Sequence, residues 1–225
     1  HRHIFLDPDP TNLDAAFNER KRMFDLPRSS WADYDKKLIS KGGGIFERSA
    51  KSIGLTPEIK ALAGLTEDAV TPDVLIKALL TADIDLLWFG GIGAYIKAST
   101  QSHADVGDKT NDILRVDAKD VRAKVIAEGA NLGVTQAGRI EFARKGGRIN
   151  TDAIDNSAGV DSSDHEVNIK ILTAEAIHEG ALKAGDRNAL LASMTDDVGH
   201  LVLENNYDQT AALSVMQATA PADLD

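Results

Sequence analysis

Runs of apolar residues interrupted by proline and glycine predict alternating strands and helices in the first part of the chain. Residues 4–6 form an apolar run that ends at two prolines, because proline cannot donate a hydrogen bond to a strand ladder. Residues 11–24 carry apolar side chains at helical spacing. Residues 28–55 show no clean period, and we expect an irregular loop with a short strand at residues 45–46.

Two Thr-Pro-acid triplets, at residues 56–58 and 71–73, predict the starts of two short helices. A threonine hydroxyl can cap the first turn, proline suits the first helical position, and an acid suits the positive end of the helix dipole. We expect these helices to end near Gly64 and Leu80.

Two apolar runs that lead into glycine-containing loops predict strands of a parallel sheet. Residues 84–89 look like a buried strand that runs into residues 90–93, and residues 123–127 run into Glu-Gly-Ala-Asn at 128–131. Strands that alternate with helices form parallel sheets, whose ligands bind at the carboxyl ends of the strands. We therefore expect an α/β fold with both loops on that edge. The remaining elements of this region are expected at residues 108–116 and 135–145 (helices) and 148–150 (strand).

The last third of the chain has a helical pattern. Apolar residues recur at helical spacing from residue 163 to about 184 and again from residue 186 onward. We expect a first domain over residues 1–160, a helical segment over residues 161–217 that packs on it as a hairpin, and a flexible tail at residues 218–225.

Composition narrows the classes of function. The 225 residues are 43% hydrophobic, which is enough for a core, and the absence of cysteine excludes thiolate metal sites and a cysteine nucleophile. The net charge is −10 with scattered cationic residues, so we expect no nucleic-acid partner. No apolar stretch approaches the roughly 18 to 20 residues that span a bilayer, so we expect a cytoplasmic protein with no membrane partner. The chain starts within an expected strand, and we expect a piece of a longer protein.

The glycine loops do not complete a known nucleotide motif. Gly91-Ile92-Gly93 lacks the third glycine of a dinucleotide fingerprint, and the chain has no Walker loop. The missing side chains of Gly90, Gly91 and Gly93, directly after a strand, would nevertheless let a flat ligand approach the backbone. We interpret the other glycine cluster, residues 42–44, as a tight turn.

The acids between residues 161 and 166 do not predict a metal site. Neighbouring positions on a helix point in different directions, so these side chains and His165 cannot all face one ion. Acids in a first helical turn are better explained by the helix dipole, with Ser162 or Ser163 as the cap.

Asn131 and Asn156 are candidate ligand contacts, because each lies among small residues. A side-chain amide presents both a donor and an acceptor, which is what a carboxamide or a ribose needs from a fixed partner. Both asparagines are equally compatible with a purely structural role in turns.

Several long segments resemble the large bacterial NAD-specific glutamate dehydrogenases. These are FGGIGAYIKAS at residues 89–99, HADVGDKTND at 103–112 and RVDAKDVRAKVIAEGANLGVTQAGRIEFARKGGRINTDAIDNSAGV at 115–160. The likeness is close over residues 84–170, extends to His1 through HRHIFLDPDP and LISKGGGIFERSAKSI, and weakens after about residue 185.

The resemblance implies oxidative deamination of L-glutamate to 2-oxoglutarate and ammonia, with hydride transfer to NAD. It implies that Asn131 lies near the nicotinamide ribose and that Asn156 holds the carboxamide. Ser163 matches the serine that receives the side-chain carboxylate of the substrate. Gly90, Gly91 and Gly93 match the loop beside the cofactor.

The resemblance is looser at three further positions. Asp7 lies where an acid that bonds the adenosine ribose would be, although Asp9 or a plain turn would explain the sequence equally well. Ser162 stands where this family type usually has cysteine, and Ala94 where it usually has threonine. Neither change need disturb the site.

The resemblance also implies which parts of the site this chain does not carry. In the family, the catalytic lysine and aspartate, the first Rossmann strand and its glycine-rich turn all precede the segment that aligns with His1. We therefore assign no catalytic residue, and we expect a Rossmann-like parallel sheet without its first strand, followed by a helical segment, that is inactive alone. Without that strand its neighbours would lie about 9.6 Å apart instead of about 4.8 Å. A segment of the longer protein fills the gap, or the remaining strands close up or pair between chains as a homo-oligomer.

Two other functions remain open on the sequence. One is a non-catalytic module for assembly or regulation, and the other is a different NAD-dependent amino-acid oxidoreductase. The response of the parent protein to NAD and its activity on glutamate distinguish these alternatives.

Overall fold

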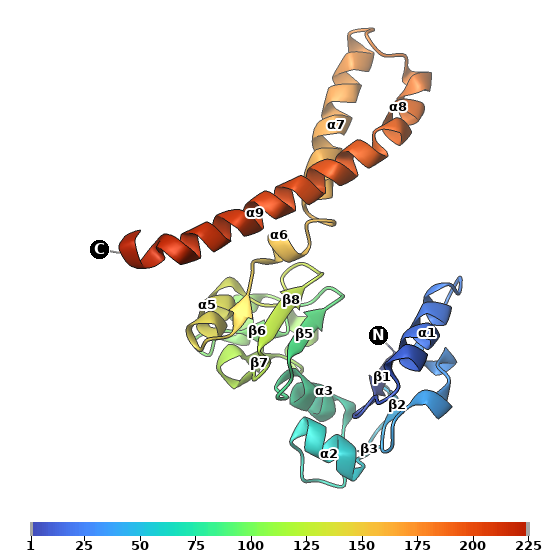
Figure 1. Ribbon diagram of the computed structural model, residues 1–225, viewed down its shortest axis with the longest axis vertical. Coiled ribbons are helices and arrows are strands. Elements are labelled where there is room, and N and C mark those ends of the chain that lie inside the picture. The colour runs from blue at the N-terminus through green and yellow to red at the C-terminus, as the bar shows by residue number, and fades with distance from the viewer. Residues whose placement is uncertain (1, 224–225) are drawn as a thin grey trace. The chain divides into compact units, whose positions relative to one another are not determined.

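A computed structural model describes residues 2–223 and shows a mixed α/β protein (Figure 1). The chain divides into two compact units. The first unit comprises the chain up to Leu87 together with Ala94–Val125 and Val134–Arg148. The second unit comprises Trp88–Gly93, Ile126–Gly133 and the chain from Ile149 onward.

The first unit begins with an antiparallel strand pair. β1 (His3–Leu6) pairs with β2 (Gly44–Glu47), with Leu6 opposite Gly44. The chain between them forms α1 (Leu13–Phe24), whose first turn is capped by Asn12, and two 3-10 turns, Trp31–Asp33 and Lys36–Leu38. The strand at residues 45–46 is confirmed. The turn expected at residues 42–44 is confirmed only in part, because the Gly43 N–H closes a turn on the Ser40 carbonyl at 3.0 Å but Gly44 already belongs to β2. β1 belongs to this two-stranded sheet and not to a larger parallel one.

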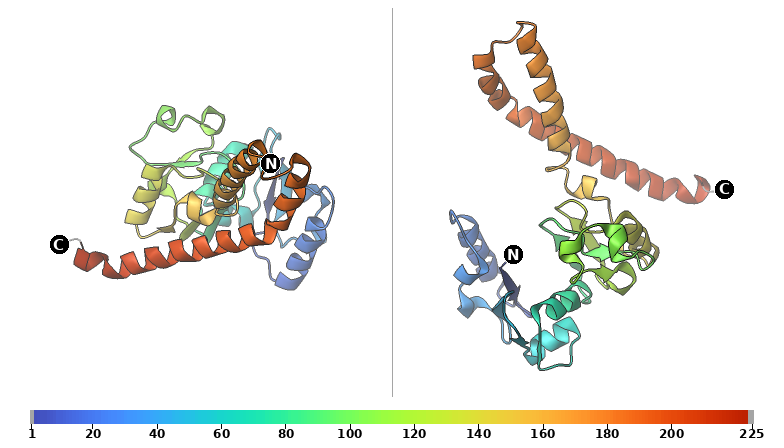
Figure 2. Two further views of the ribbon diagram at one scale, coloured as in Figure 1. Left: turned by 90° about the horizontal axis from the view of Figure 1, so that it is seen from above. Right: turned by 180° about the vertical axis from the view of Figure 1, so that it is seen from behind.

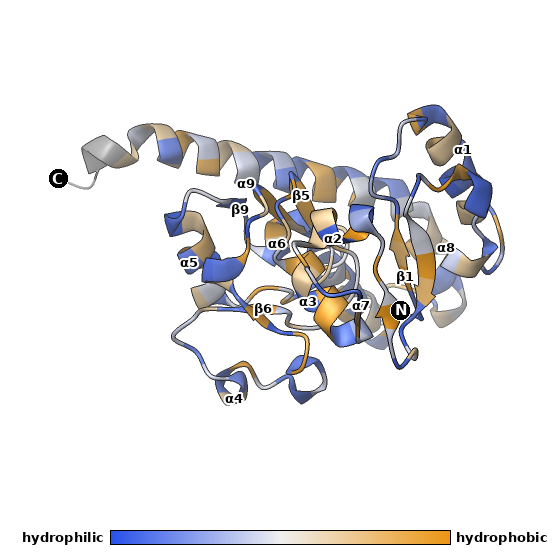
Figure 3. Cartoon of the chain, turned by 90° about the horizontal axis from the view of Figure 1, so that it is seen from below, coloured by the Kyte–Doolittle hydropathy of each residue, from blue (hydrophilic) through white to orange (hydrophobic). Residues whose placement is uncertain are grey.

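Two short helices and a second strand pair complete the core of this region. α2 (Pro57–Ala63) and α3 (Pro72–Leu80) start at the predicted prolines, and β3 (Ile53–Gly54) pairs antiparallel with β4 (Ala69–Val70). The Thr56 hydroxyl accepts from the Ile59 N–H at 3.2 Å, but Thr71 makes no side-chain cap, contrary to expectation. The core of this region is apolar along β1 and α3 (Figure 3) and includes Ile4, Leu6, Ile53, Leu55, Ile59 and Leu75.

The helix expected at residues 108–116 is not present. That stretch forms a 3-10 turn, Lys109–Asn111, and then β7 (Val116–Asp117), which pairs parallel with β6 (Ile96–Lys97). The buried Arg115 guanidinium explains the difference, because it donates to the backbone carbonyls of Ala94 and Asp108 and holds the chain in a non-helical path. The other elements are α4 (His103–Val106), a 3-10 turn at Ala118–Asp120 and α5 (Gln136–Arg144).

A three-stranded sheet carries the loops singled out in the sequence. Its order is β5 (Leu86–Phe89), β8 (Val125–Glu128), β9 (Arg148–Ile149), so the three strands expected here are confirmed. β5 lies at one edge of this sheet. It is not the buried strand that its composition suggests, because Leu86 and Trp88 are 53% and 57% exposed while Phe89 is buried.

Helices make up most of the second unit. α6 (Asp152–Asp155) is followed by α7 (Asp161–His178), a 3-10 turn at Ala184–Asp186, α8 (Arg187–Ser193) and α9 (Thr195–Asp223). α7 contacts α9, and α8 leads the chain back into α9 as a helical hairpin (Figure 2).

The apolar face of this hairpin is largely exposed. Ile171 and Leu172 of α7 are 64% and 69% exposed, whereas Val202 of α9 is buried. The packing of this segment on the sheet stays a prediction. Of the tail expected at residues 218–225, residues 218–223 continue α9, and residues 224–225 lie outside the described residues. Within the described part of the chain, no helix is both long and apolar enough to cross a bilayer.

Candidate functional site

The two loops predicted to carry ligand contacts follow neighbouring strands. β5 and β8 begin side by side, because Lys124 and Val125 donate their N–H groups to the carbonyls of Ile84 and Asp85, each at 3.0 Å. The loops after these strands therefore leave the sheet at the same end. Their closeness is direct: a Cβ added to Gly129 would lie only 2.3 Å from Cζ2 of Trp88, so the indole of β5 rests on the turn after β8.

The glycine loop after β5 exposes bare backbone. Gly90 and Gly91 are exposed, and a Cβ added to Gly91 would meet no atom within 4 Å. Gly93 has φ +123°, a conformation that side chains with a Cβ rarely adopt. A ligand could therefore reach the backbone of this loop, as the sequence predicts. At position 93, glycine is also favoured by the positive φ angle of the backbone.

Asn131 and Asn156 meet in the structure although 25 residues separate them. Asn156 Nδ2 donates a hydrogen bond to Asn131 Oδ1 at 2.6 Å. A Cβ added to Gly159 would lie 2.7 Å from Asn156 Oδ1, so this glycine leaves the space that the amide fills. Asn156 is also the residue that ends α6. It therefore has the structural role at a turn that the sequence allows, in addition to its contact with Asn131.

Two acids of α6 hold the turn that carries Asn131. The Asp155 carboxylate accepts from the Glu128 N–H at 3.0 Å, and the Asp152 carboxylate accepts from the Leu132 N–H at 2.8 Å. Leu132 has φ +59°, which is unusual for a residue other than glycine. The turn is thus fastened at both ends in a strained conformation, which sets the direction of the Asn131 side chain.

Sequence reasoning missed Asp152, Asp155 and Trp88. The sequence does contain a pattern that could have pointed to the two acids. Asp152 and Asp155 are three residues apart, which places both on one side of a short helix directly after a strand. No local pattern could show that they bind the backbone of a turn 20 and 27 residues earlier in the chain.

Ser163 lies in the first turn of α7 and is exposed. Within residues 2–223, its side chain makes no hydrogen bond to Asn131, to Asn156 or to any other residue. α7 begins at Asp161 after Val160, so neither Ser162 nor Ser163 is the helix cap, contrary to expectation. One acid of the cluster at residues 161–166 has a partner on α9: Asn205 Nδ2 donates a hydrogen bond to the Asp161 carboxylate at 3.0 Å.

Asp7 belongs to the first unit, at the end of β1. Its Oδ1 accepts from the Ser40 N–H at 2.8 Å, which fastens the loop before β2. Its Oδ2 is buried and has no hydrogen-bond partner within the described residues. Asp7 therefore has the structural role in a turn that the sequence allows. Its Oδ2 atom remains as an acceptor for a donor from outside the described residues.

Comparison with known proteins gives a consistent result. A family model described as "Bacterial NAD-glutamate dehydrogenase, catalytic domain" matches residues 1–216. Proteins named NAD-specific glutamate dehydrogenase are 61% identical over 98% of this chain in Pseudomonas aeruginosa and 55% identical over 96% in Halomonas elongata. A protein of the same name in Mycobacterium tuberculosis is 56% identical over the whole chain.

These relatives are much longer proteins. The chain spans only 13–14% of the length of each of the three. The family match, by contrast, covers nearly all of this chain and includes both glycine-containing loops and both asparagines. The chain belongs to the family of bacterial NAD-glutamate dehydrogenase catalytic domains.

Proposed function

We propose that this chain forms the nicotinamide-side part of the NAD site in a glutamate dehydrogenase that converts L-glutamate to 2-oxoglutarate and ammonia. The observation that carries the proposal is the hydrogen bond between Asn156 and Asn131 beside the open glycine loop. The names of the relatives support the reaction and the cofactor.

The paired asparagines suit a carboxamide. Within the described residues, Asn131 Nδ2 and Asn156 Oδ1 make no hydrogen bond, so each asparagine of the bonded pair keeps one amide atom for a ligand. A primary carboxamide has the complementary acceptor and donor, and nicotinamide carries such a group. When bound, NAD would accept the hydride from the substrate. Asn156 would hold its carboxamide, Asn131 would lie beside the nicotinamide ribose, and Gly90 and Gly91 would let the ring approach the backbone.

Substrate binding and the adenosine end of the cofactor involve other residues. Ser163, exposed at the start of α7, would receive the side-chain carboxylate of glutamate. The unpartnered Oδ2 of Asp7 would accept from a ribose hydroxyl. The groups that activate the substrate would come from other parts of the longer protein, so we expect this chain alone to be inactive.

We further propose that the three-stranded sheet is part of a Rossmann-like sheet. β5 lies at an edge of the sheet and exposes the apolar side chains of Leu86 and Trp88. An exposed apolar edge strand favours pairing with another strand. That strand would come from the longer protein, or from a second copy when this chain is alone.

The test uses the full-length protein and glutamate-dependent formation of NADH. Asn156→Ala should raise the KM for NAD by roughly tenfold, because a lost hydrogen bond of this kind contributes about 1 to 1.5 kcal/mol. Ser163→Ala should raise the KM for glutamate and leave the KM for NAD unchanged. Asn168→Ala and Ser214→Ala are matched controls, since both side chains bond only carbonyls of their own helices.

Three outcomes contradict the proposal. Wild-type kinetics in both Asn156→Ala and Ser163→Ala would show that these residues contact neither ligand. Activity of the full-length protein on other amino acids but not on glutamate would identify a different oxidoreductase. A full-length protein whose thermal stability does not respond to NAD would favour a non-catalytic module.

A further inference from the structure

The residue that follows the glycine loop is held by two side chains from a later part of the chain. Both polar groups of the Ala94 backbone are bonded: its N–H donates to Asp108 Oδ2 at 2.9 Å, and its carbonyl accepts from Arg115 Nε at 2.8 Å. Ala94 directly follows Gly93, whose φ is +123°. The two bonds therefore fix the backbone where the glycine loop ends, and we call Asp108 and Arg115 the clamp.

Further bonds hold the Arg115 side chain of the clamp in place. Its guanidinium is fully buried and also donates to the Asp112 carboxylate and to the backbone carbonyl of Asp108. Its Nη1 lies 2.9 Å from His103 Nδ1. Moving a buried guanidinium away from its acceptors would leave a charge without partners, which is costly. Arg115 therefore gives the clamp a rigid base.

Asn111 fixes the carboxylate of Asp108. Asn111 Nδ2 donates to Asp108 Oδ2 at 2.7 Å, so this oxygen accepts from a side chain as well as from the Ala94 backbone. The bond from Asn111 and then the bond from Ala94 lower the pKa of Asp108 below its ordinary value of 3.8. The carboxylate is therefore ionised at neutral pH, and a charged acceptor strengthens the hydrogen bond that it accepts from Ala94.

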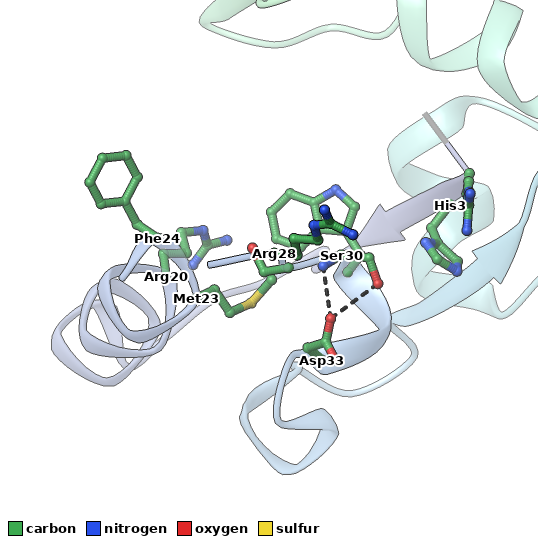
Figure 4. Close-up of a pocket in the computed structure, with 10 residues that line it drawn as sticks. His3, Arg20, Met23, Phe24, Arg28, Ser30 and Asp33 are labelled. Atoms are coloured by element: carbon green, nitrogen blue, oxygen red, sulfur yellow. Dashed lines mark hydrogen bonds between the residues drawn. The ribbon is translucent and has the colours of Figure 1, made fainter. Parts of the chain in front are cut away.

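Two other acids of the first unit show what a purely local carboxylate does. Asp33 accepts from the N–H and the hydroxyl of Ser30, at 2.8 and 3.2 Å (Figure 4). Asp105 accepts from the same two groups of Ser102, at 2.7 and 2.9 Å. Each of these acids closes the first turn of a short helical segment. The Asp108 carboxylate instead bonds a residue 14 positions earlier in the chain, so a local cap does not explain it.

We propose that Asp108 and Arg115 are positioning residues for the cofactor, which act by fixing Ala94 and through it the glycine loop. The inference rests on the proposed function, because it takes the loop of Gly90, Gly91 and Gly93 to be the one beside the nicotinamide. A loop that is fixed beforehand loses less conformational freedom when a ligand binds. The clamp therefore tightens the binding of NAD without touching it, and it does not affect the binding of glutamate.

The first measurement is hydrogen–deuterium exchange of the full-length protein without NAD, read on peptides that cover residues 89–95. Asp108→Ala removes the acceptor of the Ala94 N–H, so these peptides should exchange faster than in the wild type. Arg115 keeps its ion pair with Asp112 in this variant, so the protein should remain folded. Asp105→Ala is the matched control, because within the described residues the Asp105 carboxylate accepts hydrogen bonds from Ser102 alone.

The second measurement is the dissociation constant of NAD, obtained by calorimetric titration of the same proteins. Asp108→Ala should raise it by roughly tenfold, as expected for the loss of one charge-assisted hydrogen bond, and Asp105→Ala should leave it unchanged. Asp108→Asn should bind NAD nearly as tightly as the wild type, because an amide oxygen can still accept from the Ala94 N–H. Asn111→Ala is a milder variant that should change both measurements in the same direction as Asp108→Ala, and it serves if Asp108→Ala does not fold. The KM for glutamate should stay the same in all four variants.

Asn156→Ala separates this inference from the proposed function. If Asn156→Ala weakens NAD binding while Asp108→Ala and Asn111→Ala do not, the clamp does not position the cofactor and the proposed function stands. Unchanged NAD binding in all three would overturn the proposed function and this inference with it. Exchange in Asp108→Ala that is no faster than in the wild type would overturn the clamp itself.

Two further results would show a general structural role of the segment in place of positioning. One is an equal loss of NAD binding in Asp105→Ala and Asp108→Ala. The other is NAD binding by Asp108→Asn that is as weak as by Asp108→Ala, since the bond to Ala94 would then not be the cause.

Discussion

At the scale of single residues, the buried acid Glu19 shows how one side chain can order a loop. Its carboxylate bonds Arg22 and the backbone of Asp35, and these bonds hold its pKa at about 2, below the ordinary value of 4.5. A carboxyl group whose pKa is lowered by folding stabilises the folded state only while it is ionised. Its contribution is therefore complete above about pH 4.5 and is lost as the pH falls toward 2.

We predict that Glu19→Gln destabilises the protein at pH 7 by about 1 to 3 kcal/mol, because a charged acceptor of three donors is replaced by a neutral amide. The difference from wild type should shrink as the pH approaches 2. Urea unfolding at pH 7 and pH 3 measures both effects. Glu166→Gln, which removes an exposed ion pair with Lys170, is the control and should change stability little. A pH-independent difference for Glu19→Gln would show that the carboxylate charge plays no part.

Gly129 is a second residue with a defined steric role. Because an added Cβ would lie 2.3 Å from the Trp88 ring, Gly129→Ala must displace the indole or the turn. We predict a loss of about 1 to 3 kcal/mol in the free energy of unfolding, which is typical of overpacking. Gly185→Ala, where a Cβ would meet no atom within 4 Å, is the matched control. Equal stabilities of the two variants would mean that Trp88 does not rest on this turn.

At the scale of elements, the sequence predicts most strands and helices. It also marks both asparagines as candidate ligand contacts, because each lies among small residues. It does not predict that Asn131 and Asn156 bond to each other, because that contact depends on how α6 returns to the turn after β8. Arg115 shows the same limit. Residues around it suggest a helix, but the buried guanidinium draws the chain into an irregular path through contacts with distant carbonyls.

The turn after β8 allows a prediction at this scale. Leu132 has φ +59° and is 62% exposed, so it bears a strained backbone without burying its side chain. Asparagine tolerates this conformation better than leucine. We predict that Leu132→Asn raises the stability by about 0.5 to 1 kcal/mol, measured by thermal unfolding. Leu203→Asn, at a similarly exposed position inside α9, should not stabilise, and an equal gain in both would exclude relief of backbone strain as the cause.

At the scale of the whole molecule, local sequence patterns could not predict which strands pair with each other. The sequence predicts strands at both ends of the first 150 residues, yet β1 pairs antiparallel with β2 and is separate from the sheet of β5, β8 and β9. Which strands pair is decided by long-range contacts, and periodicity carries no information about them. The exposed apolar residues of β5 could not be foreseen for the same reason.

The exposed edge of β5 predicts self-association of the isolated chain. Leu86→Lys should lower the average mass measured by sedimentation, because a charge on an edge strand disfavours strand pairing. Ile113→Lys is the control, since Ile113 is similarly exposed at 59% but lies outside the strands. A wild-type chain that sediments as a monomer at all concentrations would contradict the prediction.

The contact between Trp88 and Gly129 has a spectroscopic consequence. An indole held against a fixed peptide turn has an asymmetric surrounding, and such a ring gives a near-ultraviolet circular dichroism band whose intensity depends on that surrounding. The chain has 2 tryptophans, so a Trp31→Phe variant of the isolated chain would leave Trp88 as the source of the tryptophan band, at the long-wavelength edge where the tyrosines and phenylalanines contribute little. That band would record movements of the asparagine-bearing turn directly, without a label.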